Sequence, residues 1–135
     1  AKSRVADDQA IITRIDAFGF RTLLMSDSGL TAESALLENS PDDMRADILV
    51  LGRHGDDVFA TSAFLAAVRP RVIILAAPDP FRDGRNEPAL RQRLAATDAQ
   101  VFDQQECGAV TVTFREGRAE VRAFLGHQAA DLTAR

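Results

Sequence analysis

The sequence predicts an α/β fold built on a mixed β-sheet with three helices on one face. Two nearly continuous apolar runs, 47–51 and 72–77, are typical of strands that are covered on both faces. Segments of helical periodicity separate these runs, so crossover helices should make the central strands parallel. Hairpin signals lie on either side of this central part. Together these patterns exclude all-α and all-β architectures.

The first half of the chain is expected to supply a hairpin, a helix and a buried strand. A segment rich in β-branched residues and a following apolar segment flank a turn that contains Gly19. Thr31 should cap the next helix, although Ser34 stands where a complete capping box has Glu or Gln. The expected elements are strands over 9–15 and 21–26, a helix over 31–39 and a strand over 47–51.

The second half is expected to supply two more helices and four strands. Leu90 and Leu94, four residues apart, give one helix an apolar face. Regular alternation on both sides of Glu116 and Gly117 is the strongest hairpin signal in the chain. The expected elements are helices over 62–68 and 88–96, strands over 72–77 and 100–102, and hairpin strands over 109–115 and 118–124.

Composition bounds the classes of protein that this chain can represent. Its 135 residues, 46% of them hydrophobic, suit one domain over 1–135, and the polar end predicts a flexible tail over 126–135. A net charge of −4 excludes a global positive field that steers nucleic acid or anionic lipid. No apolar run approaches the roughly 20 residues that span a bilayer, so this segment itself should make no membrane contact. The single cysteine, Cys107, excludes an internal disulfide and has no nearby base, which favours a structural role.

Candidate site residues follow two of the expected parallel strands. Asp27 comes after 21–26, and Arg53, His54 and Asp56 come after 47–51. Sites in open α/β sheets form outside the carboxyl ends of strands, so Asp27 and His54 should face one crevice. A carboxylate and an imidazole that converge there suit a divalent transition metal.

An ordinary structural explanation competes with the metal site. An aspartate after a strand is often a turn former or helix cap, and a histidine in a Gly-flanked loop is often a surface residue. Catalytic zinc needs about three protein ligands, and His127, which lies in the expected tail, is a poor third. Phosphate-loop and serine-elbow chemistry are excluded, because Lys2 is the only lysine and no G-x-S-x-G motif is present.

Several short motifs occur in an order that matches a known family. They are Asp7-Asp8-Gln9-Ala10-Ile11, Leu23-Leu24-Met25-Ser26-Asp27, Gly52-Arg53-His54-Gly55-Asp56, Arg69-Pro70 and Gly108-Ala109-Val110-Thr111-Val112. With them, the chain from Asp7 to Leu125 resembles the second half of a metallo-β-lactamase-fold domain. More narrowly, it is similar to the soluble C-terminal domain of ComEC-type DNA-internalisation competence proteins.

The resemblance implies a fold, a cofactor and a setting. It implies half of an αββα sandwich, with zinc as the metal, Asp27 matching the family's metal-bridging aspartate and His54 matching the metal-binding histidine of a His-His pair. DNA would be a possible partner. The chain would then be a soluble domain of a bacterial inner-membrane protein.

Departures from the family pattern point to a degenerate site. Arg53 replaces the first histidine of the pair, Asp56 replaces a serine, and Arg85 lies in a loop that has lost both family histidines. The His-x-His-x-Asp-His motif belongs to the first half of the fold, which this chain lacks. We therefore expect a non-catalytic domain with weak or absent zinc binding. The alternative is the C-terminal half of a zinc-dependent phosphodiesterase or nuclease, completed by an N-terminal half, in which Arg53 or Arg85 holds phosphate.

Partner expectations rest on the faces of the central sheet. Both faces of the strands are apolar, as the alternation of Ile48 and Val50 with Leu49 and Leu51 shows. Three helices cover only one face, and an exposed apolar face of this size is not tolerated by monomers. The sequence therefore predicts self-association through the uncovered face, or its coverage by a missing N-terminal half.

Overall fold

The computed structural model describes residues 10–52, 58–76 and 87–135. The helices and strands occur in the predicted order, with two short helical segments and one strand in addition. In chain order they are β1 (Thr13–Ala17), β2 (Phe20–Leu24), α1 (Leu30–Asn39), the 3-10 helix η2 (Pro41–Asp43), β3 (Ile48–Leu51), α2 (Ser62–Val68), β4 (Val72–Leu75), α3 (Glu87–Ala95), β5 (Gln100–Asp103), α4 (Gln104–Cys107), β6 (Val110–Arg115), β7 (Arg118–Ala123) and β8 (Ala129–Thr133). None of the described helices is long and apolar enough to cross a membrane.

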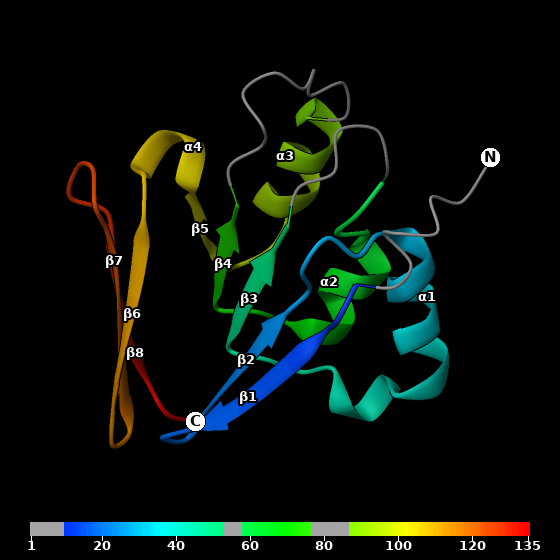
Figure 1. Cartoon of the computed structure of the whole chain (residues 1–135), viewed down its shortest axis with the longest axis horizontal. Helices are drawn as coiled ribbons and strands as arrows, with labels where there is room; N and C mark the ends of the chain where they lie inside the picture. Colours follow the sequence, from blue (N-terminus) through cyan, green and yellow to red (C-terminus); the bar gives the residue numbers. More distant parts are fainter. Residues whose placement is uncertain (1–9, 53–57, 77–86) are drawn as a thin grey trace.

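Strands β1 to β5 form a mixed sheet in sequence order, as Figure 1 shows. Strand β1 pairs antiparallel with β2, and β2, β3, β4 and β5 are parallel to one another. Crossovers of one handedness between strands in sequential order place every helix on the same face. Helices α1, α2 and α3 accordingly pack on one face, which confirms the predicted mixed sheet with three helices.

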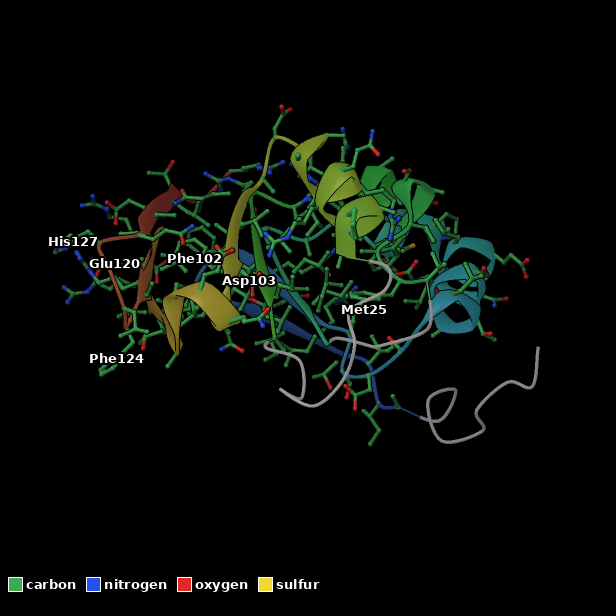
Figure 2. The ribbon with its side chains drawn as sticks, turned by 90° about the horizontal axis from the view of Figure 1, so that it is seen from above. Met25, Phe102, Asp103, Glu120, Phe124 and His127 are labelled. Carbon is green, nitrogen blue, oxygen red and sulfur yellow. The ribbon has the colours of Figure 1, made fainter. Side chains whose placement is uncertain are left out.

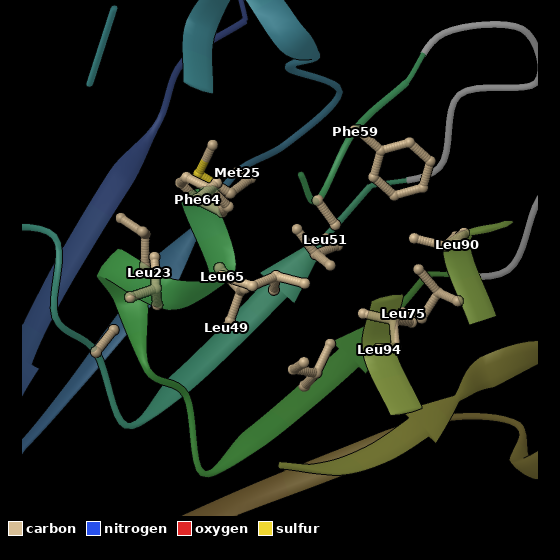
Figure 3. Close-up of a cluster of buried hydrophobic side chains, with 14 of the residues drawn as sticks. Leu23, Met25, Leu49, Leu51, Phe59, Phe64, Leu65, Leu75, Leu90 and Leu94 are labelled. Carbon is tan, nitrogen blue, oxygen red and sulfur yellow. The ribbon is translucent and has the colours of Figure 1, made fainter. Parts of the chain in front are cut away.

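The helical face encloses the larger of the two core clusters (Figure 3). Leu49 and Ile73 of the central strands are fully buried there, as are Phe64 and Val68 of α2. Leu90 and Leu94 bring the apolar side of α3 onto the same cluster, as their four-residue spacing predicts. The helices are therefore held by packing on the sheet.

A second, three-stranded antiparallel sheet in the order β6-β7-β8 covers the opposite face of the mixed sheet (Figure 1). Side chains alternate along a strand, so Val72 and Ile74 point to this second sheet while their neighbours in β4 point to the helices. Val121 of β7 and Leu132 of β8 pack against them. The expectation of an uncovered face is wrong, and the argument for self-association through that face loses its basis.

Strand β8 also corrects the expected flexible tail over 126–135. Residues 129–133 pair antiparallel with β7, from Arg122↔Ala129 to Arg118↔Thr133. Leu132 is only 8% exposed and belongs to the second core cluster. The sequence signal is weak because Leu132 is the one large apolar residue in this strand. Burial of a single side chain and pairing with β7 therefore order a segment that reads as polar.

Candidate functional site

The carboxyl ends of the four parallel strands lie side by side at one end of the mixed sheet. We call this row of strand ends the carboxyl edge. After β2, a tight turn exposes the side chain of Asp27 at this edge. The turn is closed by Ser28, whose hydroxyl donates to the carbonyl of Met25 at 2.6 Å and whose N–H donates to the same oxygen at 3.1 Å. Ser26 takes a left-handed conformation, with φ of 54°. The local sequence thus fixes the backbone that carries Asp27.

The ends of β2 and β3 touch at Gly52. Its N–H donates to the carbonyl oxygen of Ser26 at 3.0 Å. A Cβ at this position would lie 2.0 Å from that oxygen and 2.8 Å from Oδ1 of Asp27, so only glycine fits. The Asp27 carboxylate therefore lies against the residue that comes two positions before His54.

The other predicted site residues fall outside the part of the chain that the structure describes. These residues are Arg53, His54, Asp56 and Arg85. The predicted convergence of Asp27 and His54 consequently stays a prediction. The contact at Gly52 is the described feature that bears on this pair, because it brings the two strand ends together.

A buried carboxylate fixes the segment that follows residues 53–57. Glu33 of α1 is 1% exposed and accepts hydrogen bonds from the N–H groups of Ala60 and, at 3.1 Å, Thr61. From the other side, Arg93 of α3 donates from Nε to the carbonyl of Ala60 at 3.0 Å and from Nη2 to that of Phe59 at 2.9 Å. Two helices thus clamp residues 59–61 at the start of α2.

Sequence reasoning missed the role of Glu33. The available signal was its position three and four residues before Leu36 and Leu37, on the face of α1 that packs on the core. A carboxylate on an apolar helix face must find hydrogen-bond donors when it is buried. In this chain the donors are backbone N–H groups 27 and 28 residues away, and such a distant pairing leaves no local pattern.

A second buried carboxylate, Asp103, ends β5 at the same edge (Figure 2). Its Oδ1 accepts from the N–H of Gln105 at 3.0 Å, which caps α4, and its Oδ2 lies 3.3 Å from Nη2 of Arg91. The same Arg91 nitrogen lies 3.4 Å from Glu106. Asp103 is thus engaged in holding α4 against α3.

Cys107 and His127 do not add ligands to the site. Cys107 is buried in the second core cluster, and burial, with a smaller effect of Asp103, raises the pKa of its thiol. His127 lies in the exposed turn between β7 and β8, far from Met25, which precedes the Asp27 turn (Figure 2). Among the described residues, no three His, Cys, Asp or Glu side chains are grouped to hold a metal ion.

Comparisons of the chain with protein-family models, with curated proteins and with solved structures find no match.

Proposed function

We propose that this chain is a degenerate metallo-β-lactamase-like domain of the DNA-uptake type, without catalytic activity of its own. The observation that carries the proposal is the contact of the Asp27 carboxylate with Gly52, directly before Arg53 and His54. The layer order of helices, mixed sheet and second sheet corresponds to three of the four layers of an αββα sandwich, with both sheets supplied by this chain. Asp27 is then the remnant of a metal site.

The residues present do not fit a two-zinc centre. Asp27 and His54 would be two ligands, whereas a catalytic zinc ion needs about three protein ligands and an open position. In the sequence, Arg53 and Arg85 stand at positions where the family has histidines, and a guanidinium repels a metal cation. We therefore derive no reaction step through a metal.

Calorimetric titration of the chain with zinc tests this proposal. We expect no sub-micromolar binding, the same result for Asp27→Ala and His54→Ala, and no hydrolysis of DNA in the presence of zinc. One-to-one binding in the sub-micromolar range that is lost in both variants would overturn the proposal that the metal site is degenerate.

One observation favours a second candidate function, the C-terminal half of a zinc-dependent phosphodiesterase or nuclease. The exposed Asp27 carboxylate forms no hydrogen bond or ion pair with the part of the chain that the structure describes. Asp103, in contrast, is bound to Gln105 and Arg91. The reading frame upstream of Ala1 separates the two candidates. A His-x-His-x-Asp-His segment there, with zinc-dependent cleavage by the joined protein that Asp27→Ala abolishes, would establish the nuclease.

A further inference from the structure

The amino ends of the parallel strands form the opposite edge of the mixed sheet, which we call the amino edge. Segments far apart in the sequence meet there through the backbone. The N–H of Asp47 donates to the carbonyl of Arg21 at 2.8 Å, and the N–H of Arg71 donates to the carbonyl of Asp47 at 2.9 Å. The end of the chain lies beside the β1–β2 turn, with Ala134 against Gly19 (Figure 1).

Four arginines gather at this edge, and the carboxylate of Asp47 lies near two of them. We call Arg45, Arg69, Arg71 and Arg135 the amino-edge arginine cluster. Oδ1 of Asp47 lies 3.6 Å from Nη1 of Arg71 and 3.7 Å from Nε of Arg135, both longer than a hydrogen bond. The side chains of Arg45 and Arg69 are exposed and form no hydrogen bond or ion pair within the described residues.

The cluster carries positive charge that its surroundings do not neutralise. Burial lowers the pKa of Arg135, and the nearby charges of Arg45, Arg71 and Arg69 lower it further, while Asp47 alone opposes them. The guanidinium group of Arg135 is therefore close enough to those of Arg45, Arg69 and Arg71 to be repelled by them. An anion that binds between them would relieve this repulsion.

Two cavities adjoin the cluster. The first, about 530 Å³ in volume, is lined by Phe18, Arg45 and Asp47, and the second, about 660 Å³, is lined by Arg69 and Arg71. Arg135 lines both. The charged residues that line the two cavities are six arginines and three aspartates: Arg21, Arg45, Arg69, Arg71, Arg93, Arg135, Asp16, Asp47 and Asp98. In a chain with a net charge of −4, this edge is a local concentration of positive charge.

We propose that the amino-edge arginine cluster binds the phosphate group of a nucleotide, either free or as a unit of a nucleic-acid strand. Guanidinium groups present paired N–H donors that match phosphate oxygens, and several of them together suit a group with more than one negative charge. Cavities of a few hundred Å³ accommodate ligands of this size.

Phe18 is the feature that points to a nucleotide in preference to inorganic phosphate. This residue is 52% exposed and lines the first cavity, and its ring stacks on Phe114, with ring centroids 6.5 Å apart and planes 9° apart. Stacking on Phe114 restricts the orientation of the Phe18 ring. A nucleotide base can lie on an exposed aromatic ring. This inference concerns the edge opposite Asp27 and does not rest on the proposed function.

Calorimetry on the full chain at low salt tests the site with three probes: inorganic phosphate, adenosine monophosphate and a ten-residue thymidine oligonucleotide. We expect the nucleotide to bind more tightly than inorganic phosphate. Arg45→Gln and Arg69→Gln should each weaken nucleotide binding about tenfold, because each removes a charged donor. Arg122→Gln makes the same change of charge on β7, outside both cavities, and should bind like the wild type.

Phe18→Leu separates the base from the phosphate, since it should weaken binding of the nucleotide and leave binding of inorganic phosphate unchanged. Tighter binding of the oligonucleotide, with a logarithmic salt slope of about 0.7 per phosphate contacted, would identify a nucleic-acid strand as the ligand. Equal binding of both nucleotide probes would identify a free nucleotide. Absence of binding by either nucleotide probe at millimolar concentration, equal losses in Arg122→Gln, or no effect of Phe18→Leu would overturn the proposal.

Discussion

The two edges of the mixed sheet carry opposite chemistry on one set of strands. Among the described residues, the carboxyl edge carries the carboxylates of Asp27 and Asp103, and Glu33 holds the backbone at residues 60 and 61. At the amino edge Arg71 and Arg135 flank the carboxylate of Asp47, and Arg45 and Arg69 lie near Arg135. Distant segments meet at both edges, but at the carboxyl edge short turns carry the two carboxylates, whereas the arginines of the amino edge come from separate segments of the chain. In the described part of the chain, one sheet therefore carries carboxylates at one edge and arginines at the other, and each group can be altered separately.

The largest expected effect is at the carboxyl edge, from Gly52→Ala. The added Cβ would lie 2.0 Å from the backbone oxygen of Ser26, so the strand ends must separate. We expect a loss of about 3 kcal/mol or more in the free energy of unfolding, measured by urea denaturation. Gly126→Ala is the control, because it meets no atom within 4 Å and adds only the strain of a φ of 73°, about 1 kcal/mol. Equal losses in the two variants would mean that the strand ends are not in contact.

The next effect is expected from Glu33→Ala, which removes the acceptor of two backbone N–H groups and leaves Ala60 buried without its partner. The cost should be about 2 kcal/mol in the free energy of unfolding, the penalty for a buried donor left unpaired. Glu33→Gln keeps one acceptor oxygen and should lose less. Glu38→Ala, at an exposed position of the same helix, should change stability by less than about 0.5 kcal/mol. A result for Glu33→Ala as small as for Glu38→Ala would show that the clamp on residues 59–61 is unimportant.

The edges also differ in how far the sequence predicts them. Helix α2 has the bounds that the sequence predicts, 62–68, because Pro70 and the spacing of Phe64, Leu65 and Val68 are local signals. The position of Asp27 after a strand is also predicted correctly, because the strand and the turn after it are local in the sequence. The arginine cluster was not predicted, since its members lie up to 90 residues apart and Asp47, between them, reads as the start of a buried strand. Residues that are neighbours only through strand pairing leave no spacing pattern.

The coverage of the second face of the mixed sheet is also not predicted by local sequence patterns. The alternation in β6 and β7 predicts a hairpin, but not that it turns back over Ile48 and Val72. The third strand, β8, carries one large apolar side chain and so resembles a polar tail. A period of two identifies strands, but it does not show which face of another sheet they cover. In this chain the hairpin follows α4 and Gly108, which has a φ of 69°.

At the amino edge, Asp47→Asn should move stability and ligand binding in opposite directions. The amide keeps an acceptor for the N–H of Arg21, which donates to Oδ2 at 2.9 Å, but it removes the negative charge inside the arginine cluster. We expect a loss on the order of 1 kcal/mol in the free energy of unfolding and several-fold tighter binding of adenosine monophosphate. Urea denaturation and calorimetry measure the two changes. Asp131→Asn on β8 makes the same charge change and should alter neither. Weaker nucleotide binding by Asp47→Asn would show that this carboxylate helps to form the site.

The smallest expected effect is a dependence of stability on pH that is caused by Cys107, the last residue of α4. Burial, and to a lesser extent the charge of Asp103, raises the pKa of this thiol above its usual value of 9.0. The folded chain then holds the thiol proton more tightly than the unfolded chain does. The free energy of unfolding should therefore be constant at pH values below the usual pKa of the thiol, and it should fall as the pH rises from that pKa toward the raised pKa of the folded chain. The chain contains no tyrosine and Lys2 is its only lysine, so few other side chains titrate in this range. Urea denaturation at a series of pH values from neutral to alkaline should show this fall in the wild type and a flatter profile in Cys107→Ala, which has no group to titrate. If the two profiles are parallel, the thiol titrates equally in the folded and unfolded chain, and the region around α4 is open to water.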